Sequence, residues 1–274
     1  EEAMAVAHEG IARVPGDYRG YQNLCDLMIE IDPDQYLQAD EVIQQALTKF
    51  PGISNLYATR AGIFSDLVLA KREKIDALKA QERSSYYWLN QLLEREETAE
   101  NRSQSRVIAT RIEEAKQQYD SFHNQVLALR QDNETSDPNY EIALRYYDSA
   151  LLLAPYNENA IIGKGRLITS NDSKEETLLY LEQGYKTHPH SSSMGVYLGS
   201  MYNNFDLQNE AISVFNQILL SEPGNLVARI GLLAAYDAAP QLSVSQAAEY
   251  VQMSTLRFPL LVENLRIMEL VKNN

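Results

Sequence analysis

The sequence predicts an all-α solenoid of paired helices with a long helical hairpin inserted near the middle of the chain. Prolines recur at nearly constant intervals. The recurring set is Pro15, Pro51, Pro155, Pro189, Pro223 and Pro259. The first two are separated by 36 residues, and the last four by 34, 34 and 36. Between Gly62 and Pro138 there is no glycine or proline, so this stretch can form uninterrupted helices.

A recurring pattern of side-chain sizes precedes these prolines by twelve, eight and five residues. Before Pro223 the three positions hold Ala211, Phe215 and Ile218. The sets before three other prolines are Ala143, Tyr147 and Ala150; Ala39, Ile43 and Ala46; and Ala3, Ala7 and Gly10. Residues three and four apart share one face of a helix, so each set predicts a packing stripe. Because proline cannot continue a helix, each proline marks the turn into the next unit.

This pattern resembles the tetratricopeptide repeat (TPR), a 34-residue helix-turn-helix unit. Residues 192–223 match it best, 158–189 come next, and 226–259 match more loosely. The unit at 158–189 departs from the pattern at Thr177, where a small residue is usual, and at Gly184, where alanine is usual. The N-terminal units at 1–15 and 18–51 match mainly in their second helices.

The repeats and the breaker-free stretch between them together predict a division into three parts. They are N-terminal TPR-like repeats over 1–70, an extended coiled-coil-like hairpin over 71–137, and C-terminal TPR repeats with a terminal capping helix over 138–274. One repeat buries too little apolar surface to fold alone, so the repeats must stack. The chain starts inside a repeat, without its first helix. We therefore expect either a truncated array or a homodimer formed through the open N-terminal repeat.

Apolar residues of the middle segment follow the spacing of a two-helix seam. They are Ile108, Ile112, Ala115, Tyr119, Phe122, Val126 and Leu129, which step alternately by 4 and 3. Ile75, Leu78, Leu89 and Leu92 keep the same phase, with Glu82 and Ser85 as weaker members. This pattern predicts two helices of about 30 residues, each about 45 Å long. Each repeat consists of a first helix followed by a second helix. A single unbroken helix through the middle segment would put this alternation out of step, so we also expect a reversal or sharp bend between Ala70 and Lys74.

Charge and composition exclude several kinds of partner. The net charge is −14, with 4 basic and 11 acidic side chains in 1–70, 11 and 10 in 71–131, and 9 and 17 in 132–274. Acidic ends repel phosphate backbones and anionic lipids, which excludes nucleic acid and favours a basic protein or peptide partner. The longest apolar runs are too short to span a bilayer, so we expect no direct membrane insertion.

The sequence contains one cysteine and no recognisable chemical site. Cys25 lies in an apolar helical run, so we expect it in the core, with no intrachain disulfide. The start of the chain shows no signal-peptide pattern, and cytoplasm and bacterial periplasm both remain open as locations. His188 and His190 fall on a predicted turn without a third ligand nearby. We therefore expect no metal, no cofactor and no enzymatic activity.

The resemblance also implies a concave groove built from one face of the first helices. The family's groove positions correspond here to Asn159, Ile162, Arg166, Ser193, Tyr197, Asn203, Asn204, Ile230 and Asp237. This mixture can hydrogen-bond a peptide backbone and stack on its side chains, although an ordinary solvated face is the alternative. The family's clamp for a C-terminal carboxylate is absent. Its positions hold Ile162, Arg166, Tyr197, Val227 and Gly231.

A second candidate for binding is the aromatic run Tyr86, Tyr87 and Trp88. Consecutive helical residues point about 100° apart, so three cannot all enter one seam. At least one ring should therefore be exposed as an interface anchor, unless neighbouring repeats cover it.

Together these features predict a non-catalytic scaffold or adaptor that binds a peptide or protein segment in the groove. The alternative is a structural module of a larger assembly, such as a bacterial envelope or secretion machine. In that case the helical hairpin would be the docking element.

Overall fold

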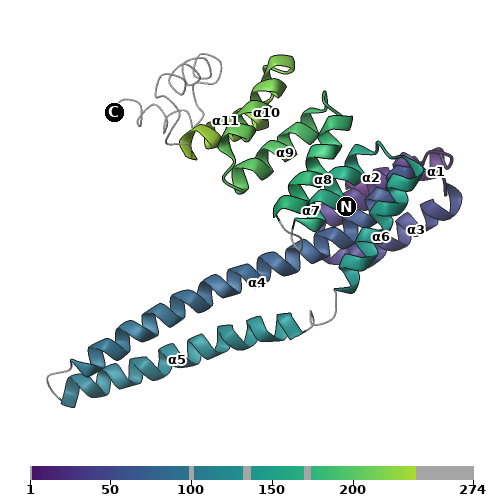
Figure 1. The fold of residues 1–274 in the computed structure, drawn as a ribbon. Helices are drawn as coiled ribbons and strands as arrows, with labels where there is room; N and C mark the ends of the chain where they lie inside the picture. Colours follow the sequence, from purple (N-terminus) through teal and green to yellow (C-terminus); the bar gives the residue numbers. More distant parts are fainter. Residues whose placement is uncertain (1, 99–101, 132–136, 170–173, 239–274) are drawn as a thin grey trace. The chain divides into compact units, whose positions relative to one another are not determined.

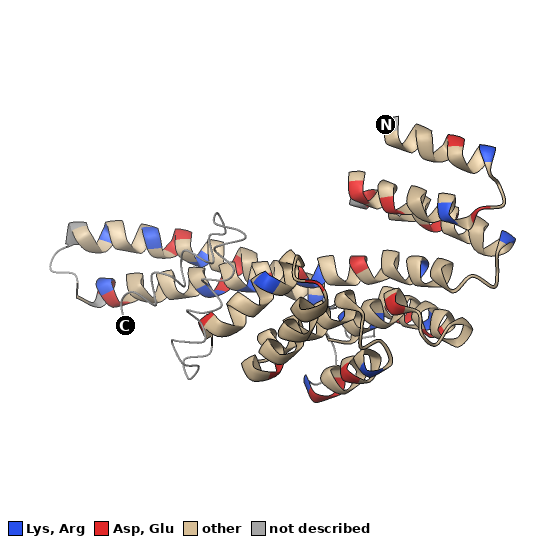
Figure 2. Ribbon diagram, turned by 90° about the horizontal axis from the view of Figure 1, so that it is seen from above, with Lys and Arg blue, Asp and Glu red and all other residues tan. Residues whose placement is uncertain are grey.

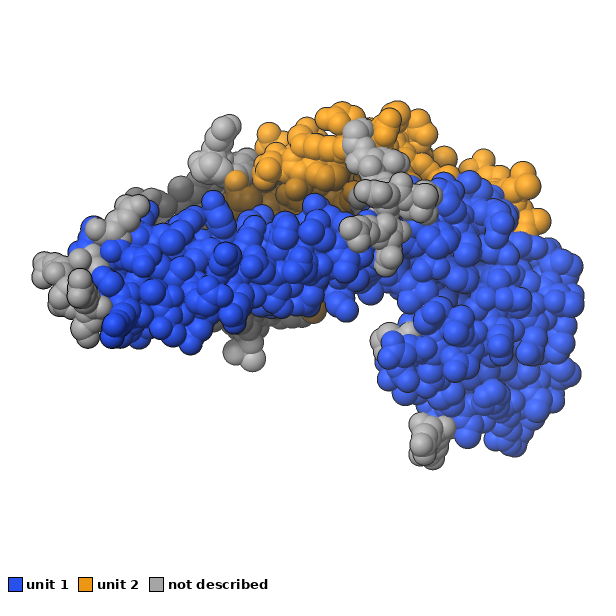
Figure 3. Space-filling view, turned by 90° about the horizontal axis from the view of Figure 1, so that it is seen from below, with its two compact units in different colours: residues 1–149 blue, residues 150–274 orange. Residues whose placement is uncertain are grey.

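A computed structural model provides the structure, which describes residues 2–98, 102–131, 137–169 and 174–238. Within these ranges all regular structure is helical, which confirms the all-α prediction (Figure 1). The chain divides into two compact units, residues 1–149 and 150–274, which are described separately below (Figure 3). The expected capping helix at 260–274 and most of the second helix expected in 226–259 lie outside the described residues.

Unit 1 begins with three helices connected by short turns. They are α1 (Glu2–Arg13), α2 (Tyr18–Ile31) and α3 (Tyr36–Lys49), with a 3₁₀ turn at Pro33–Gln35. Asp17 caps α2 by accepting a hydrogen bond from the main-chain N–H of Arg19 at 3.0 Å, which satisfies one of the open donors at the helix start. Leu24 and Cys25 of α2 pack in one core with Ile43 of α3.

The predicted packing stripes are buried in the repeats. Ala39, Ile43 and Ala46 are fully buried in α3. The equivalent residues of α10 (Gln208–Ser221) are Ala211 and Phe215, fully buried, and Ile218, 4% exposed. In α1, by contrast, Ala3 and Gly10 of the corresponding set are exposed; among the described residues, α1 packs mainly against α2.

The helical hairpin consists of α4 (Ser54–Glu97) and α5 (Arg102–Gln131), which run side by side (Figure 1). The predicted seam lies between them: every seam residue from Ile108 to Leu129 and from Ile75 to Leu92 is buried or half-buried. Ile75, Leu92 and Val126 are at most 6% exposed. Basic and acidic positions are interspersed along both helices (Figure 2).

The expected bend between Ala70 and Lys74 is wrong, because α4 is one continuous helix of 44 residues. The residues from 70 to 74 are Ala-Lys-Arg-Glu-Lys. These are strong helix formers, and none of them interrupts the main-chain hydrogen bonds.

Contacts of α6 (Pro138–Leu153) explain why no bend is needed. The ring of Tyr146 lies 6.2 Å from that of Tyr57, and the guanidinium of Arg60 lies 4.4 Å from the Tyr146 centroid. At the start of α6, Asp137 pairs with Lys71 at 3.4 Å. Helix α6 therefore packs beside the N-terminal half of α4 as its second helix. Helix α5 is an insertion within that unit, so the alternation of repeat helices is preserved.

Unit 2 contains the two repeats that best match the pattern, residues 158–189 and 192–223. Its helices after α6 are α7 (Glu158–Ile168), α8 (Lys174–Thr187), α9 (Ser192–Asn204), α10 and α11 (Leu226–Ala238). Asn157 caps α7 through the N–H of Ala160, and Ser191 caps α9 through that of Met194. The proline of each turn stands two residues before these capping residues. None of the described helices is long and apolar enough to cross a membrane.

Candidate functional site

The first helices of the unit 2 repeats form a continuous row. Helix α7 lies beside α9, and α9 lies beside α11. Small residues let these first helices pack closely against the second helices. A Cβ on Gly199 would stand 2.7 Å from the ring of Phe215, and one on Gly165 would stand 2.5 Å from Leu181. All nine predicted groove residues lie on this row of three helices. We call their outward side the first-helix surface.

Arg166 and Tyr197 form the centre of the first-helix surface. Arg166 of α7 is exposed and lies close enough to Tyr197 of α9 to interact with it electrostatically. Tyr197 is half-buried, and its hydroxyl is hydrogen-bonded to that of Thr169. Burial raises the pKa of Tyr197 above its ordinary value, with Thr169 and Arg166 opposing this shift. Arg166 therefore lies within electrostatic range of the Tyr197 hydroxyl.

Asn203 occupies a structural position. Its Nδ2 donates to the main-chain oxygen of Gly231 on α11 at 2.9 Å, and its Oδ1 is buried. This side chain joins two neighbouring first helices and has little capacity left to contact a partner.

The other predicted residues differ in their accessibility. Asn159, Ser193, Asn204 and Asp237 are exposed, Ile162 is half-buried, and Ile230 is 38% exposed. Val227 beside Ile230 is 59% exposed; the resemblance placed Val227 only at a position of the absent carboxylate clamp. The accessible residues of this surface therefore include amide, carboxylate and apolar side chains.

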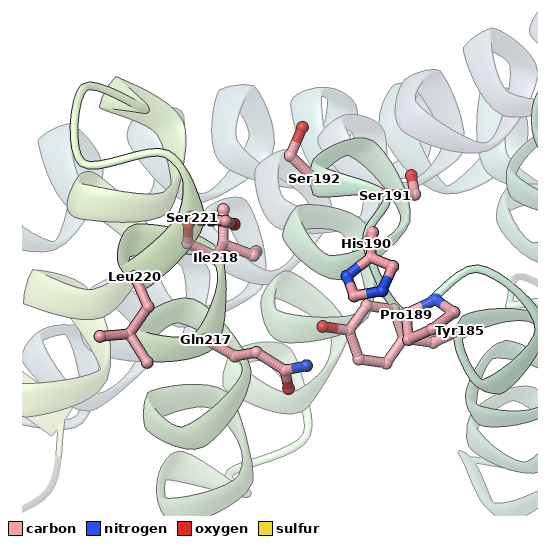
Figure 4. Close-up of a pocket in the computed structure, with 9 residues that line it drawn as sticks. All are labelled: Tyr185, Pro189, His190, Ser191, Ser192, Gln217, Ile218, Leu220 and Ser221. Carbon is pink, nitrogen blue, oxygen red and sulfur yellow. Dashed lines mark hydrogen bonds between the residues drawn. The ribbon is translucent and has the colours of Figure 1, made fainter.

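A hollow of about 320 Å³ lies elsewhere in unit 2, and none of the predicted groove residues lines it (Figure 4). It lies between the end of α8, the turn into α9 and the end of α10. Its lining residues are Tyr185, Pro189, His190, Ser191, Ser192, Gln217, Ile218, Leu220 and Ser221. Leu220 is 85% exposed, and Leu152, at the same distance from its proline, is 86% exposed. Apolar residues at these positions, which lie outside the packing stripes, were the feature of the sequence that could have indicated this hollow.

His188 forms part of the turn and does not lie in a group of metal ligands. Its Nε2 lies 2.9 Å from the main-chain oxygen of Tyr156, and its Nδ1 lies 2.9 Å from the hydroxyl of Thr187. The ring thereby links the turns of successive repeats. Among the described residues, no group of three or more His, Cys, Asp or Glu side chains is arranged to hold a metal ion.

The aromatic run on α4 is accessible. Tyr86, Tyr87 and Trp88 are 53%, 65% and 43% exposed, whereas their spacing around one helix predicted exposure of at least one. Tyr86 lies 5.7 Å from the ring of Tyr119 on α5, and Tyr119 stacks on His123. Nδ1 of His123 lies 2.6 Å from Glu82 of α4. Tyr86 is therefore held against α5, while Tyr87 and Trp88 have no ring partner within the described residues.

No family model and no curated protein sequence matches the chain. Among solved structures, TTC0263, a thermophilic TPR protein of Thermus thermophilus, is 12% identical to it. The TM-score is 0.53, over 85% of this chain and 88% of that one. Yeast Tom70 is 13% identical with a TM-score of 0.38, over 97% and 67% of the two chains, a score too low to support an argument. From the repeat geometry and the similarity to TTC0263, we conclude that the chain has the fold of a tetratricopeptide repeat protein.

Proposed function

We propose that the chain is a non-catalytic scaffold that holds an extended segment of a partner protein on its first-helix surface. The observation that carries this proposal is that exposed Arg166 and half-buried Tyr197 lie within electrostatic range of each other on that surface. A guanidinium can hydrogen-bond main-chain carbonyls or carboxylates, and a tyrosine ring supplies rigid contact area. Exposed Asn159 and Asn204 add hydrogen-bonding groups on either side.

The surroundings of this pair favour a segment with apolar side chains. Ile162 of α7 and the neighbouring Val227 and Ile230 of α11 are at least partly accessible. The net charge of −14 attracts a basic segment during approach. Solenoid repeats build extended surfaces of this kind, so the fold is compatible with the proposal.

Partner capture by crosslinking in an extract of the source cell tests this function. The test variant is Tyr197→Ala/Asn204→Ala, and the matched control is Gln183→Ala/Lys186→Ala, two exposed residues of the second helix α8. We expect the partner to be lost with the first variant and retained with the second. Retention by both variants would exclude the first-helix surface as the binding site.

A second candidate function is supported by the exposed aromatic run. In this reading the chain is a structural module of a larger assembly, and the hairpin docks through Tyr87 and Trp88. A variant with residues 76–128 replaced by a short loop separates the two functions. Loss of the partner with this variant alone would favour docking through the hairpin.

A further inference from the structure

One face of α4 carries residues at symmetric distances from Ser84. They are Glu73, Ala77, Ala80, Ser84, Trp88, Gln91 and Arg95, spaced by 4, 3 and 4 residues on each side of Ser84. This spacing keeps all seven on one helical face. Six of them are exposed and Gln91 is half-buried. We call this set the Ser84 stripe; it is distinct from the seam, whose members Ile75, Ser85 and Leu92 are buried against α5.

The Ser84 stripe is complementary to itself in an antiparallel arrangement. A two-fold axis at Ser84 places Trp88 of one copy opposite Ala80 of the other, so a large ring meets a small side chain. The same axis places Glu73 opposite Arg95, a pair of opposite charges. Ser84 meets its own equivalent on the axis, where a small residue allows two helices to approach closely. Each contact away from the axis occurs twice, as a closed two-fold interface requires.

This complementarity depends on the position of the axis. An axis one turn later, at Trp88, would set two Trp88 rings against each other and would separate Glu73 from Arg95. Within the described residues, neither Glu73 nor Arg95 has an ion pair in its own chain. Both charges are therefore available to a second copy.

The charge distribution also favours a second copy at the hairpin. Residues 71–131 carry 11 basic and 10 acidic side chains, a net charge of +1. Residues 1–70 carry 4 against 11, a net of −7, and residues 132–274 carry 9 against 17, a net of −8. Two identical chains therefore repel each other least where the hairpins meet.

We propose that the Ser84 stripe is the interface of a homodimer in which two α4 helices pack antiparallel about Ser84. The proposal does not depend on the first-helix surface, which lies in the other unit. The Ser84 stripe is a different surface from the open N-terminal repeat, where the sequence predicts self-association.

Disulfide trapping tests the position of the axis. In a Cys25→Ala background, Ser84→Cys brings two thiols together on the axis, within the Cα separation that a disulfide requires. We expect mild oxidation to convert this variant into covalent dimers. The matched control is Asn124→Cys, an exposed position on α5, which should remain monomeric on a denaturing gel. Equal trapping at both positions, or none at residue 84, would overturn the proposal.

Sedimentation equilibrium over a concentration series tests the energetics. Trp88→Ala should weaken dimerisation at least about tenfold, because it removes the largest anchor of the interface. Arg95→Glu should also weaken it, and Glu73→Arg/Arg95→Glu should restore it by reversing both ion pairs. A monomer at every concentration would refute the interface. A dimer insensitive to Trp88→Ala would also refute it and would favour self-association through the exposed face of α1.

Discussion

The side chain of Asn203 on α9 donates to the main-chain oxygen of Gly231 on α11, across 2.9 Å. This hydrogen bond joins the first helices of two successive repeats at Gly231, which packs against the second-helix residue Phe215. A Cβ on Gly231 would overlap the Phe215 ring, and one on Gly199 would lie 2.7 Å from it. Close helix approach and a large buried ring therefore depend on the same two glycines.

Gly231→Ala should lower the free energy of unfolding of unit 2 by about 1–3 kcal/mol, because the added methyl group overfills the space beside Phe215. This loss is expected despite the higher helix propensity of alanine. Urea denaturation followed by circular dichroism measures it. Gly62→Ala in α4 is the control, since a Cβ there meets nothing within 4 Å. It should leave stability unchanged or raise it by up to about 1 kcal/mol.

Arg60 should contribute strongly to the stability of unit 1. It pairs with Asp40 at 2.6 Å, with both side chains at most 15% exposed, and it covers the ring of Tyr146. Arg60→Ala leaves Asp40 largely buried without its counter-charge and should cost about 3 kcal/mol in thermal or urea unfolding. The comparison is Arg13→Ala, whose pair with Glu9 is exposed; its cost should stay below about 0.5 kcal/mol. Equal losses would show that burial of the Arg60 pair is irrelevant.

Cys25 should be inert in the folded protein and should make stability depend on alkaline pH. Burial, followed by the charges of Asp26 and Asp40, raises the pKa of this thiol from 9.0 to about 12. The folded state therefore holds the proton more tightly than the unfolded state. This contribution is complete below about pH 9 and is lost as pH rises toward 12, at about 1.4 kcal/mol per unit.

Two measurements check the behaviour of Cys25. A chromogenic thiol reagent at pH 8 should react only after the protein unfolds. Urea titrations from pH 8 to 11 should show a steeper loss of stability for wild type than for Cys25→Ala. The two proteins have the same tyrosines, so the difference between their curves reports the thiol alone. Parallel curves would contradict the assignment.

The continuity of α4 can be measured directly. Spin labels at residues 66 and 81, both exposed, should lie about 22 Å apart along a straight helix. Pulsed dipolar spectroscopy should then give one narrow distance distribution near that value, broadened by the label side chains. A distribution centred well below it would restore the bend between Ala70 and Lys74.

Much of the fold could be predicted because each prediction rested on local periodicity. The stripe Ala211, Phe215 and Ile218 identifies a buried helical face wherever the helix lies, since spacing alone decides which side chains share a face. The seam residues of α5 were predictable for the same reason. The continuity of α4 was missed because the alternation of helices was inferred without knowing which helix packs against which.

The candidate surfaces were predictable only in part. Spacing around one helix required exposure within the run Tyr86 to Trp88. It could not show that Asn203 would bond to Gly231, which stands 28 residues later. The hollow beside Tyr185 and Gln217 also joins residues from a turn and two helix ends. Such contacts depend on how helices cross, and local sequence does not specify that.

The sequence by itself determined the helical class, the repeat length, the hairpin seam and the acidic character of the chain. These properties follow from residue spacing, breaker residues and charge, which act within one helix or sum over the chain. Only the tertiary structure decided that α6 pairs with the start of α4, that Arg60 is held between Asp40 and Tyr146, and that Arg166 lies within electrostatic range of Tyr197. Those relationships arise when helices distant in sequence pack, and side-chain shape at their contacts selects one arrangement.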